Sequence, residues 1–317
     1  MEAAMYQTLN QKRIPSCMIG TWAWGNGVNG SKMIFGKSYS EQQLAETFRT
    51  AYEAGFTLWD TAEVYGMGNA EKIVGRCMEK HNGVTLSTKH MPGIKYKEGA
   101  ITKAVNGSLE RLGIEAIDLY WLHKPFALRD NLREMTRLAK AGKIKSIGVS
   151  NCRLDQIKEA KRILEESGLN LAAVQNHYSL LCMEDDKEII PFCKENDILY
   201  FGYMILEQGA LSGHYDLQHP FPAFSLRGIS FGKKKFRKVS PLIEWEKKLA
   251  EKYEVDVSQI PIAWALAKQV VPIVGLTKPQ HAQALEKGVR VELQPQEIQE
   301  LESLAQKSGV TCRGIWE

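Results

Sequence analysis

Eight short apolar runs recur along the chain, and their first residues are mostly 26 to 39 residues apart. A segment with helical periodicity follows each run. Strands that are buried on both faces read as near-continuous apolar runs, as these do. Eight β-α units in succession predict an α/β fold of the closed (β/α)8 TIM-barrel type. The predicted strands are residues 17–21, 56–60, 84–88, 117–123, 146–150, 173–176, 199–203 and 272–275.

The predicted barrel carries two additions. Residues 6–14 surround a turn at Asn10 and predict an N-terminal β-hairpin. Long loops follow several strands at the carboxyl face, and we expect the choice of substrate to lie in them and in the tail ending at Trp316. No low-complexity linker or change in charge divides the chain, so we expect residues 1–317 to form one domain. The long loops are residues 23–39, 124–131 and 207–240.

Composition excludes several classes of function. A net charge of +4 is too small to favour a nucleic-acid partner, and we interpret the basic run 233–238 as a solvated loop, with a phosphate-facing loop as the alternative. The six cysteines form no C-x-x-C pair or zinc-binding pattern, which predicts reduced thiols and no metal. Residues 1–5 hold no basic segment followed by an apolar core, and no apolar stretch approaches about 20 residues, so we expect no signal peptide and a cytoplasmic protein without a membrane partner.

Two local motifs match enzyme signatures by coincidence. Residues 25–30 fit G-x-G-x-x-G, but a dinucleotide site needs a helix at the third glycine, and we expect about ten loop residues before the helix that Ser40 caps. Residues 120–124 fit Y-x-x-x-K, but the run is a predicted strand, where positions i and i+4 do not meet. His214 and His219 lack a third spaced ligand, so we expect surface residues rather than a metal site.

Four polar residues follow consecutive predicted strands. Asp60 ends the second strand, Tyr65 lies five residues on, and Lys89 and His123 end the third and fourth. Chemistry in such barrels takes place at the carboxyl ends of the strands. We therefore expect these four residues, called the tetrad below, to converge.

The tetrad has a coherent chemistry. Free tyrosine has a pKa of about 10, and a neighbouring Lys89 ammonium is expected to lower it. Asp60 would hold that ammonium, and His123 would hydrogen-bond a substrate oxygen. Such a site can protonate a developing oxyanion, which suits the addition of hydride to a carbonyl. Side chains cannot supply hydride, so a nicotinamide cofactor is implied.

The sequence resembles the aldo-keto reductase family along nearly its whole length. The matching motifs are residues 20–22, 60–66, 87–89, 118–123, 142–144, 147–151 and 175–176. The family's catalytic residues fall on Asp60, Tyr65, Lys89 and His123, the four chosen above from their chemistry. The resemblance therefore implies that hydride comes from NAD(P)H and the proton from Tyr65.

The resemblance also implies how cofactor and substrate are held. Ser150, Asn151 and Gln175 would bind the nicotinamide carboxamide, Tyr203 would stack on its ring, and the substrate pocket would be lined by Trp22, Trp24 and Phe126. The other expected cofactor contacts are Thr21, Trp22, Asp60, Met204, Leu206, Gly275, Thr277, Lys278 and His281.

The cofactor preference is less strongly determined by these residues. Residues 203–206 read Tyr-Met-Ile-Leu where the family often has Tyr-Ser-Pro-Leu, so a side-chain contact to the pyrophosphate is lost. Lys278 supplies a cation for the 2′-phosphate of NADPH, but His281 and Leu285 replace an arginine and an asparagine common in the family. We expect NADPH to be preferred and NADH to be possible.

Three functions remain open from the sequence. The expected one is reduction of a small aldehyde or ketone by a monomer or small homo-oligomer. The first alternative is an NADPH-binding regulatory or sensing subunit with little turnover, as in some relatives. The second is a lyase in which Lys89 forms a Schiff base, although Asp60 beside it would keep the amine protonated.

Overall fold

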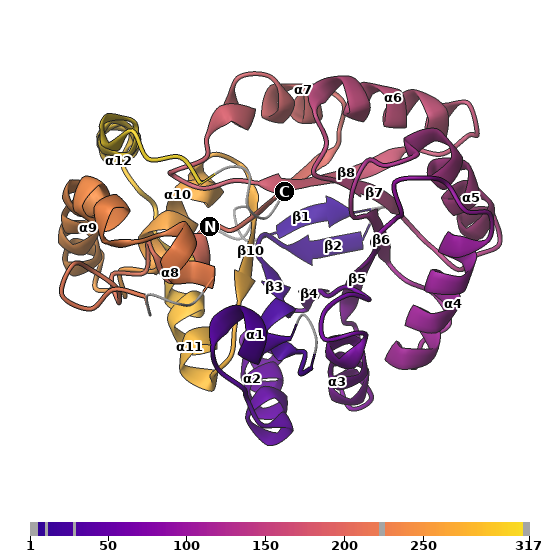
Figure 1. Cartoon of the computed structure of the whole chain (residues 1–317), viewed down its shortest axis with the longest axis horizontal. Helices are drawn as coiled ribbons and strands as arrows, with labels where there is room; N and C mark the ends of the chain where they lie inside the picture. The colour runs from indigo at the N-terminus through magenta and orange to yellow at the C-terminus, as the bar shows by residue number, and fades with distance from the viewer. Residues whose placement is uncertain (1–5, 10–11, 28–29, 222–225, 313–317) are drawn as a thin grey trace.

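The computed structural model describes residues 6–9, 12–27, 30–221 and 226–312. Eight parallel strands form a closed barrel in the order β10-β3-β4-β5-β6-β7-β8-β9, with helices around it (Figure 1). Pairing of β10 with β3, for example Ile273 with Met18, closes the ring. The predicted (β/α)8 barrel is confirmed. Its strands are β3 Met18–Gly20, β4 Leu58–Asp60, β5 Thr85–His90, β6 Leu119–Leu122, β7 Ile147–Ser150, β8 Leu171–His177, β9 Leu199–Tyr203 and β10 Val271–Gly275.

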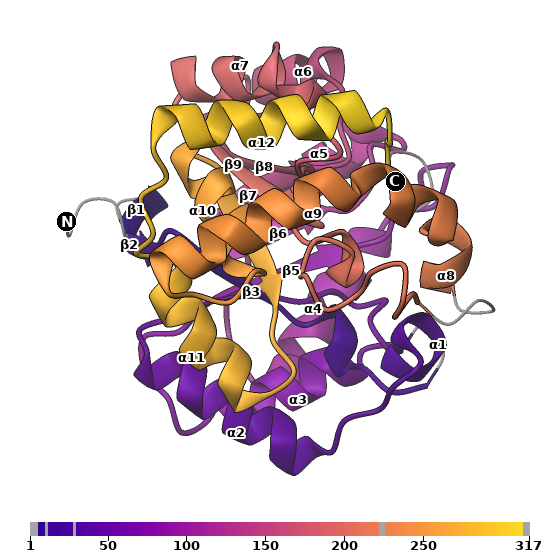
Figure 2. The same cartoon turned by 90° about the vertical axis from the view of Figure 1, so that its left-hand side faces the viewer.

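The predicted N-terminal hairpin is also present. Strands β1 (Tyr6–Leu9) and β2 (Lys12–Pro15) pair antiparallel. Leu9 and Ile14 are buried against the side chains that fill the barrel, among them Trp121 and Phe201. The hairpin thus covers the barrel at the amino ends of the strands, and Figure 2 shows it at the end opposite α1 and α8.

The main helices form the outer layer. They are α2 Glu41–Glu53, α3 Asn69–Met78, α4 Ala100–Leu112, α5 Leu128–Lys140, α6 Leu154–Glu165, α7 Ile189–Glu195, α9 Lys233–Tyr253, α10 Gln259–Ala267, α11 Pro279–Gly288 and α12 Pro295–Ser308. Shorter pieces are η2 Trp22–Trp24, α1 Ser31–Phe35, η3 Glu184–Asp186, η4 Glu207–Gly209 and α8 Leu226–Ser230. Figure 2 shows α9 and α12 side by side on one flank.

Helix α2 illustrates how local sequence determines this layer. Ser40 caps it, since its hydroxyl accepts the Gln43 N–H at 3.2 Å. Leu44 and Phe48 lie on one face and are fully buried. The Phe48 ring stacks on Trp59 of β4 with a centroid distance of 4.2 Å. Burying a side chain of this size contributes roughly 1.5–3 kcal/mol, so the amphipathic face holds α2 against the barrel.

The basic run 233–238 is not a loop, and this prediction was wrong. It forms the first turns of α9, which begins at Lys233 and is 21 residues long. Phe236 and Val239, three residues apart, are buried and anchor this end. Lys235 instead donates to the Thr311 carbonyl at 3.3 Å. The two apolar residues that anchor this end of the helix stand among basic residues, and the charge of those basic residues had suggested a solvent-exposed loop.

The glycine-rich segment also differs from the expectation. Helix α1 begins at Ser31 directly after Gly30, rather than about ten residues later. Helix α1 has only five residues and ends at Gly36, whose backbone is left-handed. A second helix, α2, follows before β4, so α1 is not the helix that a dinucleotide-binding β-α-β unit requires after its third glycine. Gly25 serves close packing instead, because a Cβ on it would lie 2.7 Å from the Tyr65 carbonyl oxygen. Residues 28–29 of this segment lie outside the described residues, as does Trp316.

Throughout the described ranges, every helix is too short or too polar to cross a bilayer.

Candidate active site

Asp60 and Lys89 form a buried ion pair at the carboxyl ends of β4 and β5. Lys89 is 0% exposed and Asp60 2%. The Lys89 ammonium donates to the Asp60 carboxylate and, at 2.9 Å, to the Thr61 carbonyl. The Ser87 hydroxyl donates to the other carboxylate oxygen at 2.5 Å. Burial lowers the pKa of Lys89, but the adjoining Asp60 and Tyr65 together raise it above the ordinary value, so the amine stays charged.

Tyr65 brings its hydroxyl to this pair. Its oxygen lies 3.4 Å from Lys89 Nζ, which is also 5.1 Å from the ring centroid. Burial raises the pKa of Tyr65, Lys89 lowers it and Asp60 raises it, and the net value is above the ordinary one. The expected lowering by Lys89 is thus present, but it does not decide the net value. The ammonium acts in the expected direction, but removal of water from the phenol outweighs it.

His123 completes the group from the end of β6. Its ring is perpendicular to that of Tyr65, with centroids 6.4 Å apart. Its backbone is held by two hydrogen bonds, one from its N–H to the His90 carbonyl and one from the Asn151 side chain to its own carbonyl, both 2.9 Å. Burial, then the Lys89 charge, holds the pKa of His123 well below its usual range. The neutral ring has a buried Nδ1 without a hydrogen-bond partner among the described residues.

Aromatic rings line one side of the tetrad. Trp22 stacks on Tyr65 at 6.1 Å, and Phe35 meets Trp22 edge-on at 5.3 Å. Phe126, 40% exposed, lies on the loop after β6. Trp24 does not join them, because it is 1% exposed, packs on Trp59 and donates to the Leu276 carbonyl at 2.7 Å. Trp24 is thus a core residue in this structure and offers no surface to a substrate.

The expected nicotinamide residues lie together at the ends of β7, β8 and β9. The Tyr203 hydroxyl donates to Asn151 Oδ1 at 2.6 Å, and the Asn151 amide donates to the Ser150 hydroxyl at 3.1 Å. His177 stacks on the Tyr203 ring at 5.5 Å. Gln175 Nε2 is buried with no partner in the described part of the chain. A carboxamide oxygen would satisfy this donor, so the residues fit a nicotinamide.

The remaining expected cofactor residues follow β9 and β10. Met204 has a left-handed backbone with φ 63°, and Leu206 packs on the core. Lys278 is exposed and directly precedes α11, whose N-terminus carries a partial positive charge from the helix dipole. His281, one turn into α11, accepts the Thr277 N–H at 3.4 Å. Desolvation, then Lys278, lowers the pKa of His281, so this ring adds no positive charge.

Two other expected contacts flank the tetrad. Thr21 is fully buried, and its hydroxyl donates to the Asp60 carbonyl at 2.9 Å, which ties β3 to β4. Gly275 is exposed at the end of β10. Both lie at the carboxyl face, on the strands that close the barrel.

Sequence reasoning missed Ser87, Glu63 and His90. Ser87 could have been found, because it lies two residues before Lys89 and therefore on the same side of β5. Glu63 lies in the loop after β4 and His90 ends β5, and their pairing required the folded structure. His90 Nδ1 lies 2.6 Å from Glu63 Oε1.

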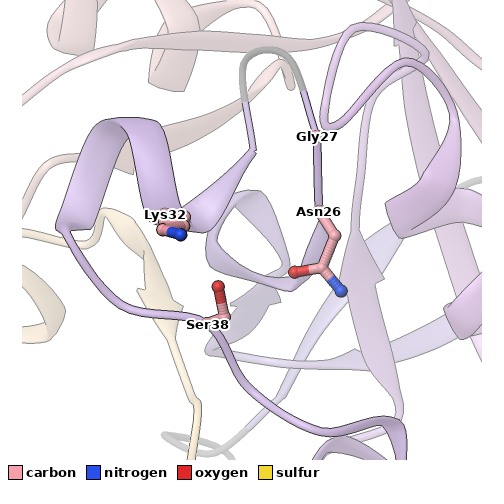
Figure 3. A pocket seen from close by; sticks show the side chains of 4 residues that line it. All are labelled: Asn26, Gly27, Lys32 and Ser38. Atoms are coloured by element: carbon pink, nitrogen blue, oxygen red, sulfur yellow. The ribbon is translucent and has the colours of Figure 1, made fainter.

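Other chemical groups lie apart from the tetrad. All six cysteines are free thiols, and five are buried. Within the described ranges, no three His, Cys, Asp or Glu side chains are grouped to hold a metal ion. A hollow of about 500 Å³ is lined by Asn26, Gly27, Lys32 and Ser38, with Lys32 and Ser38 on one side and Asn26 and Gly27 on the other (Figure 3). Its lining comes from the loop that also carries Trp22.

Comparison with known proteins gives consistent matches. The model of the Aldo/keto reductase family matches residues 17–306. "Aldo-keto reductase YhdN" of Bacillus subtilis (strain 168) is 31% identical over 84% of this chain and 82% of the relative. An aldo-keto reductase of Schizosaccharomyces pombe, yakc, whose name specifies NADP(+), is 28% identical over 88% of this chain and 87% of its own.

Solved structures share the fold. The glycerol dehydrogenase AKR11B4 from Gluconobacter oxydans has a TM-score of 0.81 and 27% identity over 95% of both chains. An aldo/keto reductase from Klebsiella pneumoniae in complex with NADP and acetate has a TM-score of 0.71 and 23% identity, covering 93% of this chain and 92% of that one. At that identity the second likeness shows the fold alone.

Proposed function

Since the chain belongs to the aldo/keto reductase family, we propose that it reduces the carbonyl group of a small aldehyde or ketone to an alcohol, with NADPH as the preferred cofactor. One observation carries this proposal. The Tyr65 hydroxyl lies 3.4 Å from the ammonium of Lys89, which is itself fixed by buried Asp60, and the neutral ring of His123 stands across from it.

Tyr65 is the proposed proton donor. Its raised pKa keeps the phenol protonated at neutral pH, so it holds the proton that a carbonyl oxygen requires as negative charge develops on it. Lys89 stabilises the phenolate left behind, because its charge opposes the effect of burial. Asp60 keeps that charge in place.

His123 is proposed to orient the carbonyl. A neutral imidazole carries one N–H donor, and a donor aimed at the substrate oxygen stabilises charge in the transition state. The backbone bonds from His90 and Asn151 fix the ring's position. Trp22, stacked on Tyr65, and Phe126 would line the substrate's path and reduce its contact with water.

The cofactor would be held at the ends of β7 to β10. Gln175, Asn151 and Ser150 would bind the carboxamide, beside Tyr203. When bound there, the reduced nicotinamide would supply a hydride to the carbonyl carbon. Lys278 and the N-terminus of α11 offer positive charge to the 2′-phosphate, which supports the preference for NADPH. The neutral His281 adds nothing, so we expect NADH to be used more weakly rather than excluded.

The Schiff-base alternative fits the site poorly. A lysine nucleophile must lose its proton, whereas Lys89 is fully buried, paired with Asp60 and has a raised pKa. Borohydride treatment in the presence of an aldehyde is therefore expected to leave Lys89 unmodified.

A label-transfer experiment tests the proposal. Benzaldehyde is incubated with the protein and NADPH deuterated on one or the other face of C4. One of the two labels is expected to appear as a single deuterium in the benzyl alcohol. An alcohol that carries neither label would contradict direct reduction, and tight cofactor binding without any alcohol would favour the sensing function.

A further inference from the structure

A second pair of polar side chains, Glu63 and His90, lies beside the tetrad without being part of it. Glu63, between Asp60 and Tyr65, extends its carboxylate to the end of β5. Oε1 accepts the Met91 N–H at 3.0 Å and lies 2.6 Å from His90 Nδ1. The side chains are 20% and 12% exposed, so solvent screens the contact only weakly. A carboxylate can only accept hydrogen bonds, so Nδ1 carries the hydrogen.

The backbones of these two residues reach three members of the tetrad. The Glu63 N–H donates to the Lys89 carbonyl at 3.3 Å, and Tyr65 follows two residues later in the same loop. The His123 N–H donates to the His90 carbonyl at 2.9 Å. The contact between the two side chains therefore connects the segment that carries Tyr65 to the one that supports His123.

We propose that Glu63 and His90 are positioning residues that set the placement of the Tyr65 hydroxyl relative to the His123 ring. The inference rests on the proposed function, in which one substrate oxygen must be within hydrogen-bond reach of both groups. That reach is about 2.6–3.2 Å. A displacement of about 1 Å can reduce the rate roughly 100-fold, so a contact that ties the two loops together governs turnover.

The Glu63 carboxylate is suited to this task. Hydrogen bonds to an ionised acceptor are about twice as strong as neutral ones, and one oxygen here holds both a backbone N–H and a ring N–H. The pair lies on β4 and β5, whereas the expected cofactor residues lie mostly on β7 to β10. Its loss should therefore affect turnover more than cofactor affinity.

The chain offers a matched control at the other end of the same strands. Asp118, 14% exposed, accepts the Leu86 N–H of β5 at 2.9 Å and pairs with Lys145 at 2.9 Å. Like Glu63, it thus binds a backbone N–H and a nitrogen of a basic side chain, but at the amino ends of β5 and β6. If Glu63 had only a structural role, replacing Glu63 and replacing Asp118 would change turnover equally.

Kinetics of matched variants test the assignment. Glu63→Leu and His90→Leu are expected to lower kcat for benzaldehyde reduction about 10- to 100-fold, with the Kd of NADPH within about twofold of wild type. His90→Asn, whose amide can replace Nδ1, should recover most of the loss, and Asp118→Leu should leave kcat unchanged. If a leucine variant fails to fold, Glu63→Gln and Asp118→Asn make the same comparison. Equal effects at Glu63 and Asp118 would overturn the proposal.

A measurement without turnover separates this inference from the proposed reaction. In protein labelled with 15N-histidine, the ring signals of His123 are expected to shift in Glu63→Leu and to stay in place in Asp118→Leu. Unshifted His123 signals in folded Glu63→Leu would overturn the positioning role. If Glu63→Leu shows this shift but the wild type reduces no carbonyl, the proposed reaction is overturned and the positioning role is still supported.

Discussion

Neutralising the buried charge pair should separate its contribution to stability from its contribution to catalysis. Asp60→Asn leaves the fully buried Lys89 ammonium with only the Thr61 carbonyl and Tyr65, and Lys89→Met leaves the Asp60 carboxylate with the Ser87 hydroxyl. Removing one partner of a buried pair typically costs about 3–5 kcal/mol, because the other charge stays buried and uncompensated. Each single variant should lose that much stability.

The double variant Asp60→Asn/Lys89→Met should behave differently. Additive losses would total about 6–10 kcal/mol, comparable to the whole stability of many domains. Because no uncompensated charge remains, we expect the double variant to be more stable than either single one. Its kcat should nevertheless stay about 100- to 10,000-fold below wild type, since the phenol of Tyr65 has lost its ammonium.

Urea denaturation followed by circular dichroism measures the stability of the four proteins, and NADPH consumption with benzaldehyde measures their activity. The control is Asp118→Asn, which removes the charge of a half-exposed pair and should change both quantities little. Additive destabilisation, or a double variant with near-wild-type turnover, would refute the account of Asp60 and Lys89.

Three further predictions concern single residues. Glu246 of α9 is fully buried, and neither of its carboxyl oxygens is hydrogen-bonded among the described residues. Burial raises its pKa well above 4.5. The free energy of unfolding should therefore fall by about 1.4 kcal/mol per pH unit as the pH rises from 4.5 towards that raised pKa. Urea midpoints at pH 5 and pH 7 should show this slope in wild type but lose it in Glu246→Gln. Lys278→Met should weaken NADPH binding by about 0.5–1 kcal/mol and leave NADH affinity unchanged. Fluorescence titration measures both affinities, and equal losses for the two cofactors would count against the contact with the 2′-phosphate. Gly25→Ala should lower kcat while Gly93→Ala should not, because an added Cβ would lie 2.7 Å from the Tyr65 carbonyl oxygen at Gly25 but no closer than 3.4 Å to a neighbouring atom at Gly93; equal rates would show that the loops adjust freely.

The barrel was predictable because its signal is repeated. Eight apolar runs with helices between them exclude most alternative folds. The carboxyl ends of the parallel strands of a barrel all lie at the same face. Asp60, Lys89 and His123 end consecutive strands, so their convergence followed from the topology. The pairing of Asp60 with Ser87 across β4 and β5 follows from the same register.

Other features depended on how loops pack, which local sequence does not determine. The pKa of Tyr65 reflects the burial of its ring, and the contact between Glu63 and His90 depends on how the loop after β4 lies against the end of β5. Trp22 and Trp24 lie in one 3-10 turn, yet one faces Tyr65 and the other the core. Tertiary packing decides which ring goes where.

The most direct test of the account is the rate of NADPH consumption with benzaldehyde for wild type and Tyr65→Phe, with the affinity of each for NADPH measured alongside. Phenylalanine keeps the ring that stacks on Trp22 and removes the hydroxyl beside Lys89. We predict that kcat falls about 100- to 10,000-fold while the Kd of NADPH stays within about twofold. Turnover in Tyr65→Phe close to that of wild type would contradict the role of Tyr65 as the proton donor.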